Sequence, residues 1–299
     1  MKFFTFEYEG LEQIGILTKD ETKIIPIDEV EGLSQEFFDM NDFIETHEKE
    51  DIKVLEKLWE GKVKANVSYD YKDIIVLAPI PLPLHDIICV GLNYKAHLVE
   101  VAKELNMKNE TPTSPVIFSK RARHANGLDA TIPLHEDITE KLDYEVELGV
   151  IIGKETSKIN KEDVKNNIFG YTIMNDVSAR DLMVKHKQWT IGKGLDGAVV
   201  MGPCIVHKDY IDYPVKLDIK SKINGEVRQD SNTENFIFDI DTLVSELSKG
   251  MTLEAGDIIS TGTPAGVGMS FTPGKFLKDG DLIECEIEKI GVLRNKVSK

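Results

Sequence analysis

The sequence predicts a mixed α+β protein that is rich in β-strands. Short stretches in which apolar and polar residues alternate recur along the chain of 299 residues, with turn-forming residues between them. Such alternation is typical of strands with one buried face. Apolar residues take a helical spacing in fewer places, chiefly at 34–60 and 240–249. The content of 41% hydrophobic residues is ordinary for a globular protein with a sizeable core.

The first 75 residues are predicted to form a small α+β unit. Three short strands joined by tight turns are expected at Lys2–Tyr8, Gln13–Leu17 and Lys23–Ile27. The helical pattern at 34–60 follows. Three prolines then prevent regular helix and leave an extended connector, at Pro79, Pro81 and Pro83. We therefore predict a small N-terminal α+β domain over residues 1–75 and a larger domain over 76–299.

The larger domain is predicted to be β-rich. The same patterns predict strands at Ile87–Val90, Ile168–Met174, Lys216–Ile223, Val227–Asp230, Asp281–Glu288 and Val292–Val297. They also predict helices at Lys161–Asn167 and Ile240–Lys249, the second of them stopped by Gly250.

The charge of the chain limits its partners. Its formal net charge is −16 and its pI is near 4.9. Binding to phosphate backbones needs clustered Lys and Arg, so nucleic acid is excluded as the main partner. An anionic small molecule stays compatible, because a bound divalent cation can invert the local field.

The cysteines and the hydropathy pattern bear on location. Three scattered cysteines without Cys-x-x-Cys spacing argue against a disulfide scaffold or a zinc ribbon and suit a reducing compartment: Cys89, Cys204 and Cys285. Acidic residues interrupt the N-terminus within nine residues, so it lacks a signal-peptide core. No run approaches the roughly 18 apolar residues of a membrane span. We predict a cytoplasmic protein with no membrane partner.

An acidic strand at 142–153 is the most informative stretch. Asp143, Glu145 and Glu147 share one parity there, while the residues between them are apolar. Alternate side chains of a strand point to the same side, so the two glutamates can lean onto a single hard cation. The alternative is a half-exposed strand whose acids face water. With 52 Asp and Glu in the chain, that alternative is favoured when this segment is considered alone.

His97 and Glu100 are predicted to lie one helical turn apart. The apolar run that ends at Gly91 is followed by a segment of helical character, and residues spaced by three share a helical face. A carboxylate beside an imidazole fixes its tautomer and raises its basicity, which suits a general base acting on water. A surface His beside a surface Glu is the alternative.

Two further residues stand where ligands are often bound. Asp176 lies at the corner between a predicted buried strand and a helical segment, which suits a ligand or a helix N-cap. Lys193 is flanked by Gly192 and Gly194, so the backbone can approach a ligand closely there. The alternative for Lys193 is an ordinary solvated lysine.

A basic cluster and a glycine-rich loop complete the candidates. The cluster is unusual in so acidic a chain, and either binds an anionic substrate or balances nearby carboxylates; it comprises Lys120, Arg121, Arg123 and His124. The loop at 262–268 can direct backbone N–H groups at a carboxylate or phosphate. Its spacing differs from that of a Walker A loop.

Five motifs in this order resemble the fumarylacetoacetate hydrolase family. They are Gly-Leu-Asn-Tyr-x-x-His-x-x-Glu at 91–100, Asp-Tyr-Glu-Val-Glu-Leu at 143–148, Asn-Asp-Val-Ser-Ala-Arg-Asp at 175–181, Trp-x-x-Gly-Lys-Gly at 189–194 and Thr-Gly-Thr-Pro-Ala-Gly-Val-Gly at 261–268. The resemblance covers roughly residues 70–299. Within the family the chain is most similar to the bacterial branch that is 2-hydroxyhepta-2,4-diene-1,7-dioate isomerase-like or acylpyruvate hydrolase-like.

The resemblance implies a β-sandwich-roll in the catalytic domain, a homodimer and a divalent metal. It makes Glu145, Glu147 and Asp176 the metal ligands. Such an all-oxygen shell favours Mg²⁺, with Mn²⁺ or Ca²⁺ as alternatives, over zinc. The remaining matched residues are the catalytic pair His97 and Glu100, Lys193 as a catalytic and substrate-binding residue, and Gly262 and Thr263 in the substrate-binding loop. Asp143 is expected to support the ligands.

The resemblance also implies an enzyme acting on a 2-oxo acid. The first hypothesis is hydrolysis of a C–C bond in 2,4-dioxo acids of acylpyruvate or fumarylpyruvate type, through a metal-bound enolate and water activated by His97 and Glu100. The alternative is an isomerase, tautomerase or decarboxylase of a 2-oxo diacid, such as 2-hydroxyhepta-2,4-diene-1,7-dioate or an oxaloacetate-like acid. A third hypothesis is a non-catalytic metal-binding module. Some family hydrolases have a substrate-contacting Gln where this chain has Met183, so the resemblance does not identify the substrate. Residues 92–110 are expected to close over the site as a lid.

Overall fold

A mixed sheet runs through the computed structural model, which describes residues 1–104 and 110–299. Within these ranges the sheet has eleven strands, in the order β4-β3-β2-β1-β13-β11-β10-β16-β6-β7, with β5 paired to β1. The bounds are β1 Lys2–Tyr8, β2 Leu11–Leu17, β3 Lys23–Pro26, β4 Tyr69–Asp70, β5 Ile75–Val76, β6 Ile87–Gly91, β7 Val116–Lys120, β10 Val146–Ile152, β11 Ile168–Asp176, β13 Val199–His207 and β16 Ile258–Ser260. Only the β16–β6 pair is parallel among these described strands.

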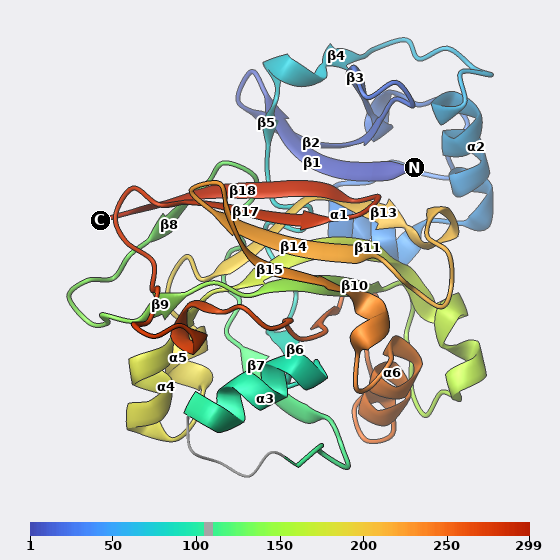
Figure 1. The fold of residues 1–299 in the computed structure, drawn as a ribbon. Helices are drawn as coiled ribbons and strands as arrows, with labels where there is room; N and C mark the ends of the chain where they lie inside the picture. The colour runs from blue at the N-terminus through green and yellow to red at the C-terminus, as the bar shows by residue number, and fades with distance from the viewer. Residues whose placement is uncertain (105–109) are drawn as a thin grey trace.

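A second sheet packs against the middle of the first. Its order is β15-β14-β17-β18-β8, and it lies over β10, β11 and β13 (Figure 1). Its strands are β8 Thr131–Pro133, β14 Asp218–Ile223, β15 Glu226–Asn232, β17 Leu282–Ile287 and β18 Gly291–Ser298. Val146 and Leu148 of β10 share one hydrophobic cluster with Ile283 of β17. β10 and β11 are buried along their whole length. The β-rich mixed class predicted from the sequence is confirmed.

The helices lie around these sheets. They are α1 Met40–Thr46, α2 Lys49–Trp59, α3 Lys95–Glu104, α4 Arg180–His186, α5 Thr190–Lys193 and α6 Ile240–Ser248, with 3₁₀ turns at Ile27–Glu29, Tyr71–Asp73, Lys161–Asn167, Lys208–Tyr210, Thr233–Asn235 and Gly268–Ser270. Figure 1 shows α3, α4 and α5 gathered beside β6, β7 and β9 (Leu142–Asp143), far from the N-terminal strands. None of the helices in the described ranges is both long and apolar enough to cross a membrane.

The positions of the helices were predicted more accurately than the residues at which they begin and end. The pattern at 34–60 divides into α1 and α2 because two caps begin them: Asp39 accepts from the amide of Asp42, and Glu48 and Asp51 form a capping box. Residues Lys161–Asn167 form a 3₁₀ turn where an ordinary helix was predicted. α6 ends at Ser248, two residues before the predicted stop.

The N-terminal segment shares a sheet and a core with the rest of the chain. β1 is hydrogen-bonded to β13, and Phe3 and Phe43 pack on Phe169 of β11. The predicted boundary between residues 75 and 76 falls inside β5, which pairs with β1. The division into domains over 1–75 and 76–299 stays a prediction about folding units.

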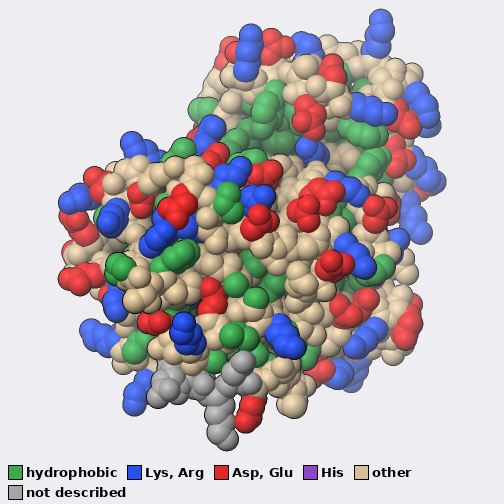
Figure 2. All heavy atoms as spheres, viewed as in Figure 1, with side chains coloured by type: hydrophobic (Ala, Val, Ile, Leu, Met, Phe, Trp, Pro, Cys, Tyr) green, Lys and Arg blue, Asp and Glu red, His purple; other side chains and the backbone are tan. Residues whose placement is uncertain are grey.

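Charges of both signs are interspersed on the surface. On the face drawn in Figure 2, Lys and Arg side chains alternate with Asp and Glu. The net charge of −16 is therefore not gathered into one acidic patch on that face.

His207 is buried where the N-terminal segment meets the sheet. It is 4% exposed and packs edge-on against Phe3, Phe169 and Tyr210. The amide of Asp209 donates to its Nδ1 at 3.4 Å. Burial lowers the pKa of His207 to about 4, because the charged ring would lose its hydration.

The stability of the protein is therefore expected to fall on acidification. Between pH 6.5 and 4 the unfolded chain binds a proton at His207 that the folded protein excludes, so unfolding is favoured as pH falls. The loss approaches about 3 kcal/mol at pH 4. Urea unfolding from pH 4 to 7.5 measures it, and His207→Gln should flatten the slope while His186→Gln, at an exposed position, should not. Parallel slopes in wild type and His207→Gln would contradict this assignment.

Candidate active site

Three carboxylates meet at the ends of the central strands. Glu147 lies on β10, Asp176 ends β11, and Glu145 precedes β10. β10 and β11 are antiparallel neighbours, and the amide of Asp176 donates to the carbonyl of Glu145 at 2.9 Å. One oxygen from each carboxylate lies within 4.8 Å of the others. The side chains are buried, so the alternative of a half-exposed strand with its acids in water is wrong.

The acidic stretch is two strands, not one. β9 (Leu142–Asp143) pairs with β12 (Ser178–Ala179) in a separate two-stranded ladder. Asp143 accepts from the amides of Gly268 at 2.7 Å and Met269 at 3.1 Å, and from Nε of Arg180 at 2.9 Å. Asp143 thus holds an arginine and a loop next to the three carboxylates, which agrees with the supporting role predicted for it.

Three buried cations contact two of the carboxylates. Nζ of Lys193 lies 2.6 Å from Oε2 of Glu145 and 2.5 Å from Oδ2 of Asp176. Nη2 of Arg180 lies 2.6 Å from Oε1 of Glu145. Nζ of Lys120 lies 2.7 Å from Oδ1 of Asp176. Lys193 is 3% exposed, so the alternative of a solvated surface lysine is wrong.

These contacts determine the charge states of Glu145 and Lys193. Burial would raise the pKa of Glu145, but Arg180 and Lys193 outweigh it and lower the pKa to about 2. Burial would likewise lower the pKa of Lys193, but Asp176 and Glu145 outweigh it and raise the pKa above its ordinary value. Glu145 is therefore a carboxylate, and Lys193 an ammonium, at neutral pH.

Glu147 has a different environment. Its Oε2 accepts from the hydroxyl of Ser260 at 2.6 Å and from the amide of Gly262 at 2.9 Å. No Lys, Arg or His among the described residues forms an ion pair with it. Burial raises the pKa of Glu147 to about 8, and repulsion by Asp176 and Glu145 adds to the rise. This carboxylate lacks an opposing charge.

The local charges fit a divalent cation. Four buried carboxylates of the described chain face three buried cations: Asp143, Glu145, Glu147 and Asp176 against Lys120, Arg180 and Lys193. A divalent ion held by the three clustered carboxylates would supply the positive charge that Glu147 lacks. An all-oxygen donor set suits Mg²⁺, Mn²⁺ or Ca²⁺ rather than zinc.

The pair on α3 has the predicted geometry. Nδ1 of His97 and Oε2 of Glu100 are 2.9 Å apart. Since a carboxylate only accepts, Nδ1 carries the hydrogen, and Nε2 is the ring nitrogen left for a ligand. Oε1 of Glu100 accepts from the amide of Gly266 at 2.8 Å. His97 is 4% exposed, so the alternative of a surface pair is wrong for the histidine.

The glycine-rich loop directs its amides at the protein's own carboxylates. The amides of Gly262, Gly266 and Gly268 donate to Glu147, Glu100 and Asp143. Gly262 has φ 98°, and a Cβ there would lie 2.8 Å from Cβ of Asn93, so only glycine fits. The structure thus gives the Gly262 amide a partner other than the predicted substrate.

Thr263, the other residue predicted to bind substrate, lines the cavity. Its hydroxyl donates to the carbonyl of Val146 at 2.9 Å and accepts from Nε2 of Gln229 at 2.7 Å. These two bonds fix the hydroxyl in place. Its contact with a substrate stays a prediction.

The basic cluster does not act as one unit. Lys120 balances Asp176, which is one of the two roles predicted for the cluster. Arg121, Arg123 and His124 are exposed and line a separate hollow that includes Asp196. Of the two roles left open for the cluster, charge balance applies to Lys120, and the binding of an anionic substrate by the other three residues stays a prediction.

Asp176 is not a helix N-cap. α4 begins after Ala179, whose side chain makes no capping bond. The Asp176 oxygens are engaged by Lys120 and Lys193 instead. Its position at the strand end serves the carboxylate cluster alone.

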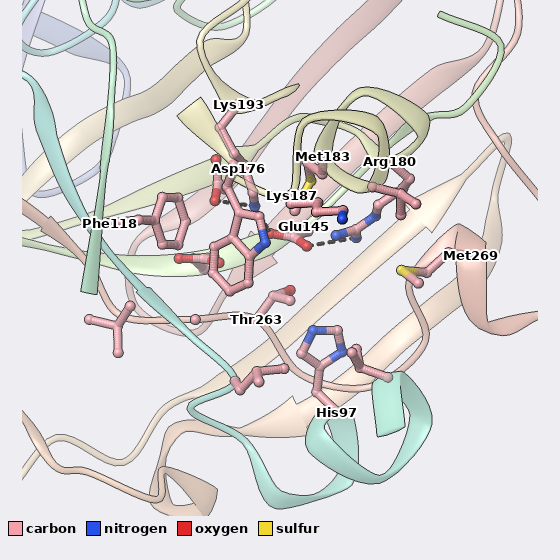
Figure 3. A pocket seen from close by; sticks show the side chains of 17 residues that line it. His97, Phe118, Glu145, Asp176, Arg180, Met183, Lys187, Lys193, Thr263 and Met269 are labelled. Carbon is pink, nitrogen blue, oxygen red and sulfur yellow. Dashed lines mark hydrogen bonds and ion pairs between the residues drawn. The ribbon is translucent and has the colours of Figure 1, made fainter. Parts of the chain in front are cut away.

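The carboxylates and the histidine face one cavity of about 210 Å³ that opens to solvent. Figure 3 shows His97 across the cavity from Glu145 and Asp176. Its apolar lining includes Val90, Val101, Phe118, Met183, Val184, Trp189 and Met269. α3 contributes one wall. The predicted lid at 92–110 extends over residues 105–109, which lie outside the described residues, and its closure stays a prediction.

No role was predicted for Arg180, although it stands in the third of the five family motifs. Its two ion pairs join Asp143 to Glu145. Arginine in an acidic neighbourhood was the available signal, but which carboxylates it meets depends on the pairing of β9 with β12.

Comparisons with known proteins identify the family of the chain. The family model described as "Fumarylacetoacetate (FAA) hydrolase C-terminal" matches residues 86–298. The "oxaloacetate tautomerase YisK" of Bacillus subtilis is 41% identical over 99% of this chain and 100% of its own length.

Solved structures share the whole fold. A fumarylacetoacetate hydrolase from Exiguobacterium antarcticum is similar with a TM-score of 0.79 and 36% identity, over 100% of this chain and 99% of that one. A 2-hydroxyhepta-2,4-diene-1,7-dioate isomerase from Mycobacterium marinum is similar with a TM-score of 0.73 and 28% identity, over 100% and 98%. The ordered motifs, the clustered carboxylates and these matches agree, and the chain belongs to the fumarylacetoacetate hydrolase family.

Proposed function

We propose that this protein is a divalent-metal-dependent tautomerase of a 2-oxo dicarboxylic acid of the oxaloacetate type. One observation carries the proposal: a single cavity holds three clustered carboxylates, one of them without a counter-charge, and His97 oriented by Glu100. The relative from Bacillus subtilis named as an oxaloacetate tautomerase, and the solved isomerase, support isomerisation over the hydrolysis that the sequence first suggested.

The cation is proposed to be Mg²⁺, held by Glu145, Glu147 and Asp176. When bound, it withdraws electrons from the carboxylate and oxo group of a 2-oxo acid and so makes the C3 hydrogens acidic. The chain supplies the remaining chemistry with its own side chains.

His97 is proposed to move the proton at C3. Its Nε2 is the nitrogen left for the substrate, because Nδ1 is bonded to Glu100. Glu100 is itself fixed by the amide of Gly266. The ring therefore keeps one orientation. Its Nε2 accepts the C3 proton when the enol forms, while the 2-oxo oxygen takes a proton from solvent, and ketonisation reverses both transfers.

Lys193 is proposed to serve the oxygen side of the reaction. Its ammonium lies between Glu145 and Asp176 and lines the same cavity. A fixed donor there stabilises negative charge that develops on the 2-oxo oxygen. Apolar side chains such as Phe118 and Trp189 limit the water around it.

Hydrolysis of an acylpyruvate is the second candidate. The pair His97–Glu100 also fits the activation of water, and the relative from Exiguobacterium antarcticum is named as a hydrolase. The third hypothesis, a non-catalytic module, has no support among these relatives, which are named as enzymes.

The proposal includes a cytoplasmic homodimer that binds a small 2-oxo acid and neither nucleic acid nor membrane. The cysteines are consistent with a reducing compartment, since Cys89, Cys204 and Cys285 are all buried free thiols. The acidic charge of the chain opposes nucleic-acid binding.

A substrate comparison tests the proposal. With Mg²⁺, the purified protein is expected to ketonise enol oxaloacetate with a kcat/KM about 100-fold or more above that for cleavage of acetylpyruvate or fumarylpyruvate. Absorbance of the enol and enzymatic assay of released pyruvate measure the two reactions separately. Faster cleavage than ketonisation would favour the hydrolase and overturn the tautomerase.

A further inference from the structure

Lys187 lies at the mouth of the active-site cavity in an unusual backbone conformation. It is the C-cap of α4 with φ 53° and ψ 20°, and its amide donates to the carbonyl of Val184. A left-handed conformation is uncommon for a residue other than glycine.

The side chain of Lys187 enters the cavity. Lys187 lines it together with Arg180, Lys193 and Glu145, and Figure 3 shows its ammonium directed into the space that these residues enclose. Lys185, two residues earlier, is exposed as Lys187 is, but it is not among the lining residues.

The other cations of the cavity are already paired. Arg180 contacts Asp143 and Glu145. Lys193 contacts Glu145 and Asp176. Within residues 1–104 and 110–299, no carboxylate or hydrogen-bond acceptor contacts the ammonium of Lys187. Lys187 is thus a cation of the cavity that is left for a ligand.

Apart from Arg180, which is already paired, the lining on the Lys187 side of the cavity is apolar. It includes Met183, Val184 and Trp189, with Met269 on the loop that Asp143 anchors. A ligand group that extends from the carboxylate cluster toward the mouth would meet apolar surface and this one ammonium. A second carboxylate matches that combination.

We propose that Lys187 binds the distal carboxylate of the substrate and so makes the enzyme prefer 2-oxo dicarboxylic acids to monocarboxylic ones. This inference rests on the proposed function, because it takes the first carboxylate and the oxo group to lie at Glu145, Glu147 and Asp176. Lys187 is then a specificity-determining residue that recognises a charge and takes no part in proton transfer.

Binding of two non-reacting 2-hydroxy acids tests the inference. Lactate and malate carry the same chelating group and differ by one carboxylate. In the presence of Mg²⁺, calorimetric titration of wild type is expected to show malate bound about tenfold or more tighter than lactate. Lys187→Gln should abolish this preference, Lys187→Arg should retain most of it, and Lys185→Gln should leave it unchanged.

Lys187→Gly separates binding from folding. Glycine adopts positive φ without strain, so this variant is expected to unfold at a temperature equal to or above that of wild type while it loses the preference for malate. Equal binding of the two acids by wild type, or a malate preference that persists in Lys187→Gln and Lys187→Gly, would overturn the inference.

The same variants separate this inference from the proposed function. A malate preference that depends on Lys187 in a protein that fails to ketonise oxaloacetate would leave the carboxylate subsite standing and refute the tautomerase. Ketonisation of oxaloacetate with the same KM in wild type and Lys187→Gln would refute the subsite and leave the tautomerase standing.

Discussion

Glu147→Gln is expected to remove divalent-metal binding and to lower kcat/KM for a 2-oxo acid by about 10³-fold or more. The substitution changes one of three clustered ligands into a neutral amide of the same shape. Its side-chain oxygen can still accept from Ser260 and Gly262, as Glu147 does. The fold is therefore preserved while the metal site loses a charge.

The stability of this variant should move in the opposite direction from its activity. In EDTA and above pH 8, where Glu147 of the metal-free protein is ionised, Glu147→Gln is expected to unfold at a higher temperature than wild type, because a buried charge without a counter-ion has been removed. Added Mg²⁺ should stabilise wild type and have little effect on the variant. Calorimetric titration and thermal unfolding measure both effects.

Asp129→Asn is the matched control for this experiment. It also neutralises one carboxylate, but Asp129 is about half exposed and pairs with Arg294 at the surface. Metal binding and kcat/KM should stay at the wild-type level, with a stability change of about 1 kcal/mol or less. Mg²⁺ binding by Glu147→Gln with wild-type affinity would show that Glu147 is not a ligand.

Lys193→Met is expected to raise the affinity for Mg²⁺ while kcat falls by about 10²- to 10³-fold. The ammonium of Lys193 lies 2.6 Å from Glu145 and 2.5 Å from Asp176. It therefore neutralises the two carboxylates that a cation would use. Its removal frees Oε2 of Glu145 and Oδ2 of Asp176 for the metal but deletes the proposed donor to the 2-oxo oxygen.

Without metal, the same variant should be less stable by about 3–5 kcal/mol, because two buried carboxylates lose a common partner. Much of this loss should be recovered in Mg²⁺, which thermal unfolding with and without the ion would show. Lys120→Met is the control: Lys120 contacts Asp176 at 2.7 Å but is absent from the cavity lining. Lys120→Met should also lower the stability, but it should reduce kcat less than Lys193→Met does. Weaker Mg²⁺ binding by Lys193→Met would show that the lysine supports the metal instead of competing with it.

Features that depend only on residues close together in the sequence were predicted correctly. The spacing of His97 and Glu100 predicted their contact, which the structure confirms at 2.9 Å, because residues three apart share a helical face. The strands of the first 27 residues were placed to within two residues, since alternation and turn residues are both local signals.

Burial of the acidic stretch could not be predicted from its own pattern. Glu145 and Glu147 alternate with apolar residues, which suggested one face in water. The strands of residues 218–298 cover one side of β10, and Ile151 of β10 packs in the second cluster with residues of the N-terminal segment. Both coverings come from parts of the chain far away in sequence. That Glu145 and Glu147 lie close to Asp176 was predicted only from the resemblance to the family.

The partners of the glycine-rich loop show the same limit. Its capacity to donate amide hydrogens was predicted from glycine content. Which oxygens would receive them was not, because Glu100, Asp143 and Glu147 approach the loop only through tertiary contacts over more than 100 residues. The roles of Lys120 and Arg180 likewise depend on which strand ends meet.

The most direct test of the account is the rate at which enol oxaloacetate is ketonised as metal is removed and restored. We expect the purified protein to lose catalysis in EDTA, to regain it when Mg²⁺ is added in excess, and to release no pyruvate above the uncatalysed level. Ketonisation at an unchanged rate in EDTA would contradict the metal-dependent tautomerase proposed for this site.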